Sequence, residues 1–343
     1  MPVTSSSTPF TLSRRGALRT AAGAALAACG AGSARASGGG WSPADRVDYI
    51  VPSGAGAALD MAARRLGQIL EAQKLAKSIV VSNKAGGAGQ LALHVLQQSA
   101  GNGNVLSSLS SSFLTGHATG TLSARIADFT PVAILVDEFV TVAVRADSPI
   151  RDARDLAARL RQNPQAHSIG VASSLGNHIH IGIARPLKLG GVDVGRLTVA
   201  PFKSSAESMN ALLGGHIDVV SSSTPNVIAH LNAGRIRVLA VDAADRLGGA
   251  LAAVPTWREQ GFDVVGVSSQ GILAPKGIPP AALDYWVRAL RTATRTPEWK
   301  EFVATNQLRE HFVAGADAAG YLDRQYGAMT VALRDLGLLD RTA

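Results

Sequence analysis

Cysteine is almost absent from this sequence: Cys29 is the only one among 343 residues. A single thiol excludes a disulfide within the chain and a metal site built from several cysteines. Aromatic residues make up only 5% of the chain, which disfavours a cleft that stacks sugar rings on tryptophan or tyrosine. After residue 36 no apolar run approaches the roughly 18–20 residues that a membrane-spanning helix needs.

Positive charge is also scarcer than the total suggests. The formal net charge is +8, but the four arginines of residues 1–36, which contain no acid, account for half of it and leave +4. No block of lysine and arginine interleaved with aromatic residues occurs, so no nucleic-acid partner is expected. A mildly positive surface suits a small anionic ligand. With 46% apolar residues, a chain of this length can fold into two domains.

The N-terminal segment, residues 1–36, is predicted to be an export signal. Ser13-Arg14-Arg15 carries a twin arginine of the Tat type, although Ala17 stands where that motif usually has a bulky apolar residue. Ala34-Arg35-Ala36 offers a small-x-small cleavage site. Leu26-Ala27-Ala28-Cys29 resembles a lipoprotein signal, so Cys29 is either an acylated mature N-terminus or part of a discarded signal. The mature protein is expected in the periplasm, free or lipid-anchored through Cys29.

Beyond the glycine linker 38–40, short apolar runs alternate with helical periods, which is typical of an α/β fold with parallel strands. Pro280 is expected to begin a helix, and a last helix is expected over roughly 316–335. The predicted strands are 47–51, 79–82, 105–109, 132–136, 140–145, 168–172, 197–201, 217–221, 237–241 and 270–274.

The turns that follow these strands share small and hydroxylic residues. Open α/β sheets bind ligands at the carboxyl ends of their strands, where helix N-termini supply unpaired N–H groups and partial positive charge. Three such turns precede residue 140 and three follow it, which predicts two lobes facing one cleft. The alternative is that serine and glycine simply favour turns and caps. The turns are 53–58, 85–89, 110–112, 173–177, 203–205 and 221–224.

The turn at Gly54-Ala55-Gly56-Ala57-Ala58-Leu59 matches five positions of the dinucleotide motif G-x-G-x-x-G, but Leu59 replaces the third glycine. The next predicted strand ends at Asn83, without the acid that would bind a ribose. A dinucleotide is therefore disfavoured and a different anion favoured. Asp60 would repel an anion beside it, so it points aside, orders a water, or meets an amine or hydroxyl of the ligand.

A second alternative is a serine hydrolase. Ala172-Ser173-Ser174-Leu175-Gly176 resembles a nucleophile elbow centred on Ser174, with alanine in place of the first glycine. Asp242 or Asp263 followed by His311 has the order that a triad needs. No earlier His-Gly-Gly oxyanion motif supports this alternative.

Several isolated residues carry weaker signals. His178 and His180 would lie about 200° apart on a helix, so they cannot share a metal there, and one is expected to face the cleft. Lys203, at a strand end, is either solvated or at the mouth of an anion cleft. Phe113 and Phe202 either flank a flat ligand or belong to the core.

Short motifs in a specific order resemble the solute-binding receptors of tripartite tricarboxylate transporters, the TctC or Bug group. The resemblance runs from about residue 47 to 337. The motifs are Ile50-Val51-Pro52 with Gly54, Gly56 and Asp60; Asn83 with Gly86-Gly87-Ala88-Gly89; Asp128-Phe129-Thr130-Pro131-Val132-Ala133; Pro201-Phe202-Lys203; Leu213-Gly214-Gly215-His216-Ile217-Asp218; Ala233-Gly234-Arg235-Ile236-Arg237-Val238-Leu239-Ala240-Val241; Val254-Pro255-Thr256 with Glu259 and Gly261; and Ala274-Pro275.

The resemblance implies a fold of the periplasmic-binding-protein type II class, with two α/β lobes, a ligand cleft between them and two crossover strands. The lobes would be 41–139 plus 246–343, and 140–245. It further implies a monomeric, non-enzymatic receptor without cofactor or metal. Such a receptor holds a small carboxylate through backbone amides and ordered waters, closes on it, and delivers it to membrane permease subunits.

Combining the turns with the resemblance gives the expected ligand contacts. Phe202 and Ser204 depart from the tyrosine and glycine usual in the family, Gln270 stands near a position often held by tryptophan, and 101–104 replaces a usual Pro-Asp-Gly turn. These departures put the identity of the ligand in doubt more than its class. The expected contacts are Ser53, Gly54, Ala55, Gly56, Ala57, Asp60, Ser110, Ser111, Ser173, Ser174, Asn177, His178, Lys203, Ser204 and Ser222.

Overall fold

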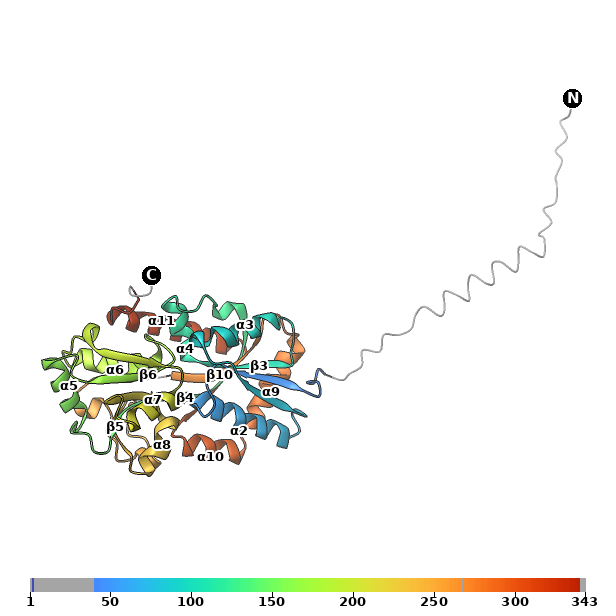
Figure 1. The fold of residues 1–343 in the computed structure, drawn as a ribbon. Helices are drawn as coiled ribbons and strands as arrows, with labels where there is room; N and C mark the ends of the chain where they lie inside the picture. Colours follow the sequence, from blue (N-terminus) through green and yellow to red (C-terminus); the bar gives the residue numbers. More distant parts are fainter. Residues whose placement is uncertain (1, 3–39, 267, 340–343) are drawn as a thin grey trace. The chain divides into compact units, whose positions relative to one another are not determined.

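The computed structural model describes Pro2, residues 40–266 and residues 268–339. Apart from Pro2, the predicted export signal lies outside the described residues, and so does Cys29. From Trp41 onward the chain forms one compact unit that contains two β-sheets (Figure 1).

The first sheet has six strands in the order β11-β4-β10-β3-β1-β2. β1, β2 and β3 run parallel, whereas β10 is antiparallel to β3 and β4, and β11 is antiparallel to β4. Its strands are β1 (Val47–Val51), β2 (Ile79–Asn83), β3 (Val105–Ser110), β4 (Phe129–Glu138), β10 (Ser268–Pro275) and β11 (Arg309–Ala314). Its helices are α2 (Ala58–Ala72), α3 (Gln90–Gln98), α4 (Ser111–Ala118), α9 (Pro280–Thr294), α10 (Pro297–Thr305) and α11 (Ala316–Asp335).

Buried apolar side chains hold these helices against the two faces of the first sheet. On one face Leu66 of α2 and Trp286 of α9 pack with Tyr49 of β1. On the other face Leu93 of α3 and Leu322 of α11 join a second cluster. The central strands β1, β3, β4 and β10 are largely buried on both sides, which explains the apolar runs in their sequences.

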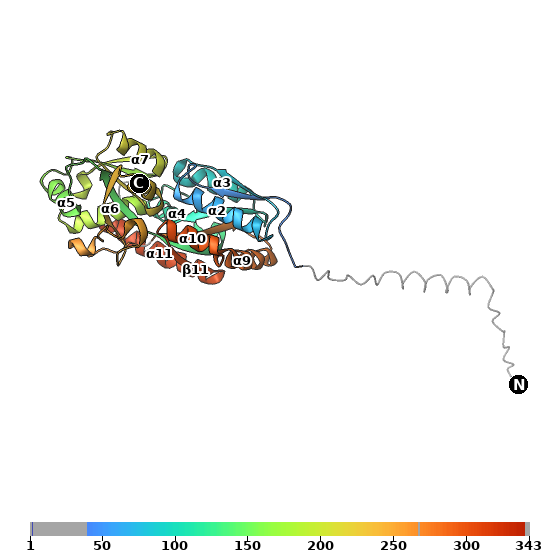
Figure 2. The ribbon, with the colours of Figure 1, turned by 90° about the horizontal axis from the view of Figure 1, so that it is seen from below.

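The second sheet has five strands in the order β7-β6-β8-β5-β9, with β6, β7 and β8 parallel and β5 antiparallel to both of its neighbours. Figure 2 shows α5, α6 and α7 around this sheet and α2, α3, α9 and α10 around the first. Its strands are β5 (Val140–Arg145), β6 (Ser168–Ala172), β7 (Thr198–Phe202), β8 (Val219–Ser223) and β9 (Ile236–Val241). Its helices are α5 (Ala153–Gln162), α6 (His178–Leu189), α7 (Ser205–Leu213) and α8 (Thr224–Asn232).

Two connections join the sheets. β4 continues into β5 through Phe139, and the chain returns from β9 to β10 through residues 242–267. The two connections bond to each other, because the Val140 N–H donates to Asp242 Oδ1 (2.7 Å) and the Asp242 N–H donates to the Val140 carbonyl (3.0 Å). Within the return connection the Gly266 N–H donates to the Asp242 carbonyl (2.8 Å). A side chain at Gly266 would collide with the Asp242 carboxyl group, so only glycine fits there. These residues lie where any relative motion of the lobes must be absorbed.

The return connection packs against the second sheet. Leu251 and Val254 join a core cluster on one side of this sheet, while Trp257 and Phe262 join the cluster on the other. The rings of Trp257 and Phe262 meet edge to face at 5.3 Å. We therefore propose moving 246–266 from the first lobe, where the sequence analysis put it, to the second. The lobes would then be 41–139 plus 268–339, and 140–266.

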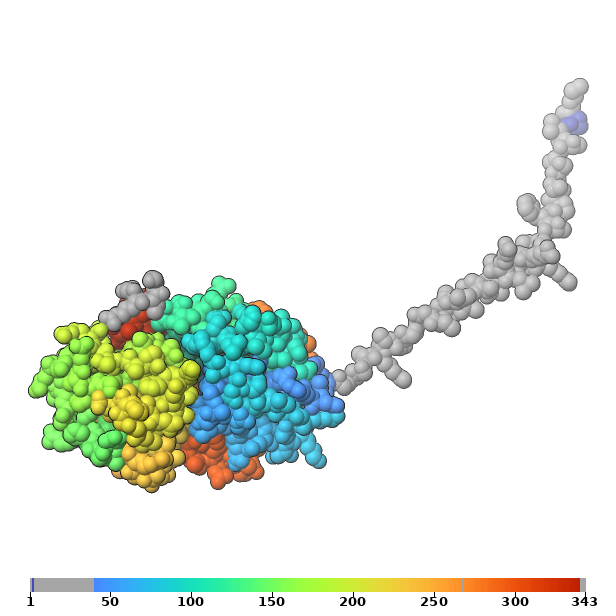
Figure 3. All heavy atoms as spheres, in the orientation of Figure 1, coloured from blue at the N-terminus to red at the C-terminus, as the bar shows by residue number. Residues whose placement is uncertain are grey.

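All ten predicted strands are present, with ends that differ by at most three residues, and the helices that begin at Pro280 and cover 316–335 are confirmed. The α/β fold with two sheets is also confirmed. β11 was not predicted. In Figure 3 the yellow-green surface around the second sheet meets the blue surface around the first along a seam.

Candidate functional site

A cavity lies between the two sheets, and both contribute to its lining. Its empty space, including the part open to solvent, is about 790 Å³. Its polar lining comes from the turns after β1, β3, β6, β7 and β8, as the strand-end argument predicts. These lining residues include Ser53, Ser110, Ser112, Ser173, His178, Lys203, Ser204, Ser205, Ser223 and Asn226.

Six helices begin at this cavity: α2, α3, α4, α6, α7 and α8, and Gly89, the N-cap residue of α3, belongs to its lining. Asn177 and Ser204 cap α6 and α7, accepting hydrogen bonds from the N–H groups of His180 (2.9 Å) and Glu207 (3.2 Å). Within the described residues, the N-cap residues of α2, α4 and α8 make no side-chain cap bond. First-turn N–H groups have no partner inside their own helix, so the starts of α2 and α4 are suited to an external anion. In α8 the Thr224 N–H donates to the Phe139 carbonyl (2.9 Å) and Pro225 has no N–H group, so this start offers less.

The Asp60 side chain fixes the conformation of the turn from Ser53 to Asp60. This carboxylate is 2% exposed and accepts hydrogen bonds from the Gly56 N–H (2.9 Å), Arg64 Nε (3.0 Å) and Asn83 Nδ2 (2.9 Å). Burial alone would raise its pKa, but these three donors outweigh burial and lower it. Asp60 therefore points aside, one of the three expected arrangements, and does not line the cavity.

The two sheets' turns touch at the mouth of the cavity. A Cβ atom added to Gly54 would lie 3.3 Å from Cβ of Ser204, closer than side chains normally pack. Lys203 is exposed at the same edge, and its backbone N–H donates to Glu207 Oε2 (2.9 Å). The close approach of Gly54 and Ser204 shows that the cleft is closed at this point.

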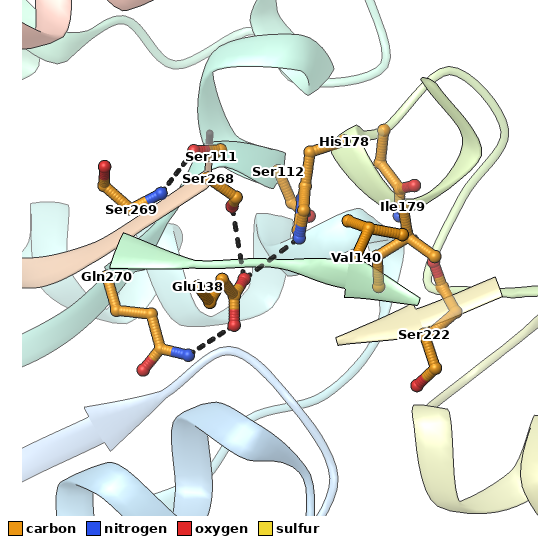
Figure 4. A network of polar contacts seen from close by, with 12 residues as sticks. Ser111, Ser112, Glu138, Val140, His178, Ile179, Ser222, Ser268, Ser269 and Gln270 are labelled. Atoms are coloured by element: carbon orange, nitrogen blue, oxygen red, sulfur yellow. Dashed lines mark hydrogen bonds and ion pairs between the residues drawn. The ribbon is translucent and has the colours of Figure 1, made fainter. Parts of the chain in front are cut away.

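A buried ionisable pair closes the cavity on the side of the two connections (Figure 4). Nε2 of His178, at the start of α6, lies 3.0 Å from Oε1 of Glu138, at the end of β4, and both side chains are less than 10% exposed. Nδ1 of His178 is bonded to the Ser112 hydroxyl of α4 (3.1 Å). Ser268 and Gln270 of β10 donate to Glu138 (3.2 and 2.6 Å). The pair thus links α6 of the second sheet to three elements of the first.

The pKa of Glu138 reflects two opposing effects. Burial favours the neutral carboxyl group, but the neighbouring His178, Gln270 and Ser268 outweigh it and lower the pKa. Asp242, nearby in the return connection, shows the opposite balance. Burial, aided by the charge of Glu138, raises its pKa to about 7 even though the Val140 N–H favours the charged form.

With this geometry in place, the family can be determined. The model of the tripartite tricarboxylate transporter family receptor matches residues 63–328. The chain belongs to this receptor family. BugT of Bordetella pertussis is 27% identical over 260 residues, which is 74% of this chain and 78% of that protein.

Solved structures share the fold of this family receptor. The periplasmic binding protein BugD superposes with a TM-score of 0.78 at 24% identity, covering 86% of this chain and 99% of that one. A Rhodopseudomonas palustris protein with adipate gives a TM-score of 0.77 at 23% identity and covers 85% and 97%. MatC of the same organism, with bound malate, gives 0.75 at 21% identity and covers 84% and 99%.

The structure of this receptor brings seven of the fifteen predicted contacts into the cavity lining. The other eight are not part of the lining. Asp60 and Asn177 hold turns, and Ser111 accepts the Ser269 N–H (3.0 Å). The buried Ser222 hydroxyl has no hydrogen-bond partner among the described residues. The seven lining residues are Ser53, Ala57, Ser110, Ser173, His178, Lys203 and Ser204. The remaining four outside the lining are Gly54, Ala55, Gly56 and Ser174.

The sequence analysis missed Glu138 and Asn226, which also line the cavity, and it placed Ser112 in a cleft turn without counting it as a contact. Glu138 carried a usable signal, because Asp137-Glu138 ends an otherwise apolar strand. Phe113 lines the cavity, as the alternative in which it flanks a ligand required. Phe202 instead packs beside Gly170 of β6 and joins a core cluster of the second sheet.

The competing hypotheses gain no support from this receptor. Nδ1 of His311 lies 2.8 Å from Asp137, Asp263 pairs with Arg258 (3.1 Å), and Asp242 bonds to Val140, so the expected triad around Ser174 is not assembled. Searching the described residues reveals no group of three or more His, Cys, Asp or Glu side chains placed to hold a metal. Across the same residues, every helix is too short or too polar to span a bilayer.

Proposed function

We propose that this protein is an exported, non-enzymatic receptor that captures a small organic acid between its two lobes and delivers it to membrane permease subunits. The observation that carries the proposal is the convergence of six helix starts on one cavity, of which α2 and α4 have no side-chain cap among the described residues and keep first-turn N–H groups for a ligand. Each helix start favours a nearby anion by about 0.3–1 kcal/mol, and several acting together in a partly buried cleft suit a carboxylate.

The proposed contacts come from both lobes. Ser53 and the first-turn N–H groups after Ala57 lie on one side, and Ser173, Lys203 and Ser204 lie on the other. An anion that bonds to both sides would bind the closed form more tightly than the open one, so it would shift the population toward closure. Asp60 would fix the conformation of the turn from Ser53 to Asp60 through its hydrogen bonds and would not line the cavity.

The relatives support this ligand class. The named ligands of two proteins with the same fold, malate and adipate, are both carboxylates. Membership of the receptor family supports delivery to a transporter, and it also supports a periplasmic location for the mature protein. We propose that the protein acts as a monomer, because one chain already supplies both sides of the cavity.

The proposal is tested by a thermal-shift screen of the mature protein against mono-, di- and tricarboxylates, with the corresponding amides as matched uncharged controls. A ligand that binds only the native state stabilises it by about 2.7 kcal/mol at a concentration of 100 times Kd. We expect at least one acid to raise the unfolding midpoint while its amide does not. The absence of any shift across the acids, or equal shifts with the amides, would contradict the proposal.

A further inference from the structure

One side of the cavity lining is apolar, whereas the polar lining residues come from the turns after the strands. Five apolar side chains border it on the side of α3 and α4, and all five belong to one core cluster of the first sheet. Each is at most 7% exposed. We call this group the apolar wall: Leu93, Leu109, Phe113, Leu122 and Leu273.

The cationic side chains of the cavity suffice for one carboxylate only. Among the described lining residues, Lys203 is the only lysine or arginine, and it stands at the exposed mouth. The other two ionisable groups, Glu138 and His178, already face each other at 3.0 Å. A second ligand carboxylate would find no second cationic side chain in the lining. If the ligand body carried it beside the buried Glu138 or against the apolar wall, it would be a buried unpaired charge, which is strongly unfavourable.

We propose that the ligand carries a single carboxylate on an apolar body, aliphatic or aromatic, and that this body packs against the apolar wall. The inference rests on the proposed carboxylate-binding function and narrows it to amphipathic monocarboxylates. Phe113 then acts as a specificity-determining residue. Its ring meets Phe129 edge to face at 5.7 Å, which fixes its position in the wall.

The first test compares hexanoate with adipate by titration calorimetry, because the two acids have the same six carbons and differ by one carboxylate. We expect hexanoate to bind at least tenfold more tightly. From butanoate to hexanoate the affinity should rise about fourfold for each methylene buried. Equal or tighter binding of adipate would overturn the inference but leave the carboxylate receptor intact. If no acid of any class binds, the proposed function itself fails.

The second test replaces Phe113 by leucine and uses Phe202→Leu as the matched control, because Phe202 packs beside Gly170 outside the cavity lining. Phe113→Leu should weaken 3-phenylpropanoate at least fivefold and butanoate, which is too short to fill the wall, less than twofold. The control should change neither. Equal losses for both acids with Phe113→Leu, or no loss for either, would overturn the inference. If that variant does not fold, Leu93→Val is measured with the same pair of acids and the same criteria.

Discussion

Gly54 provides a sharp test of closure, because the absence of its side chain allows the two lobes to meet. An alanine Cβ at this position would lie 3.3 Å from Cβ of Ser204, so the closed form must shift by a few tenths of an ångström to admit it. Gly54 is not among the residues with positive φ, so alanine fits its backbone without strain. The cost therefore falls on the closed form alone.

Overpacking usually costs about 1–3 kcal/mol, and a contact this slightly short belongs at the lower end. We expect Gly54→Ala to weaken binding of the best organic acid about fivefold, equivalent to roughly 1 kcal/mol. The unfolding free energy without ligand should stay within about 0.5 kcal/mol of the wild type. Titration calorimetry and urea denaturation measure the two quantities.

The matched control removes the opposing atom. Ser204→Gly costs only a few tenths of a kcal/mol of stability as a helix N-cap change, and it also removes the proposed ligand contact of its hydroxyl, so the effect of Gly54→Ala is compared within the Ser204→Gly background. There Gly54→Ala should weaken binding much less than it does with serine at 204. The reasoning is refuted if Gly54→Ala binds as tightly as the wild type. It is refuted equally if the loss is the same whether residue 204 is serine or glycine.

Three further predictions concern buried charges. Asp60→Asn should lower the unfolding free energy by about 1–3 kcal/mol at pH 7. Because the fold lowers the pKa of Asp60, the wild type should lose this stability as pH falls below about 4, and urea titrations should show no such loss in the variant. The pKa of Asp242 is raised to about 7, so its contribution to stability is full below pH 4 and falls as pH rises toward 7. Asp242→Asn keeps the acceptor for Val140 and should be more stable than the wild type at pH 8, by up to about 4 kcal/mol, but not at pH 4; equal pH profiles would contradict this. His178→Ala should destabilise the protein by about 3–5 kcal/mol by leaving Glu138 unpaired, and adding Glu138→Gln should recover part of the loss in thermal unfolding; no recovery would argue against the pair.

Much of the fold could be predicted because its central strands are largely buried on both faces and appear in the sequence as short apolar runs. β11 lacked that signal. It begins Arg309-Glu310-His311, and as an edge strand paired only with β4 it leaves these polar residues half-buried or exposed. The packing of 246–266 was also hidden, because the contacts of Trp257 with the second sheet depend on tertiary structure.

The site was predictable in its backbone and not in its side-chain network. The small residues of the turn 53–58 follow directly from their place between a strand and a helix. The orientation of Asp60 depends on Asn83, which the pairing of β1 with β2 brings close. The Glu138–His178 pair joins residues 40 positions apart in different lobes, so nothing local in the sequence connects them.

The central claim, that main-chain N–H groups from both lobes bind one carboxylate, is tested most directly by ¹⁵N–¹H spectra recorded while the best organic acid is titrated. The account predicts saturable downfield amide proton shifts at Ala58 and Leu59 of α2 and at Ser205 of α7, with one shared Kd that matches calorimetry. Saturable binding without shifts at these amides, or with shifts confined to one lobe, would contradict it.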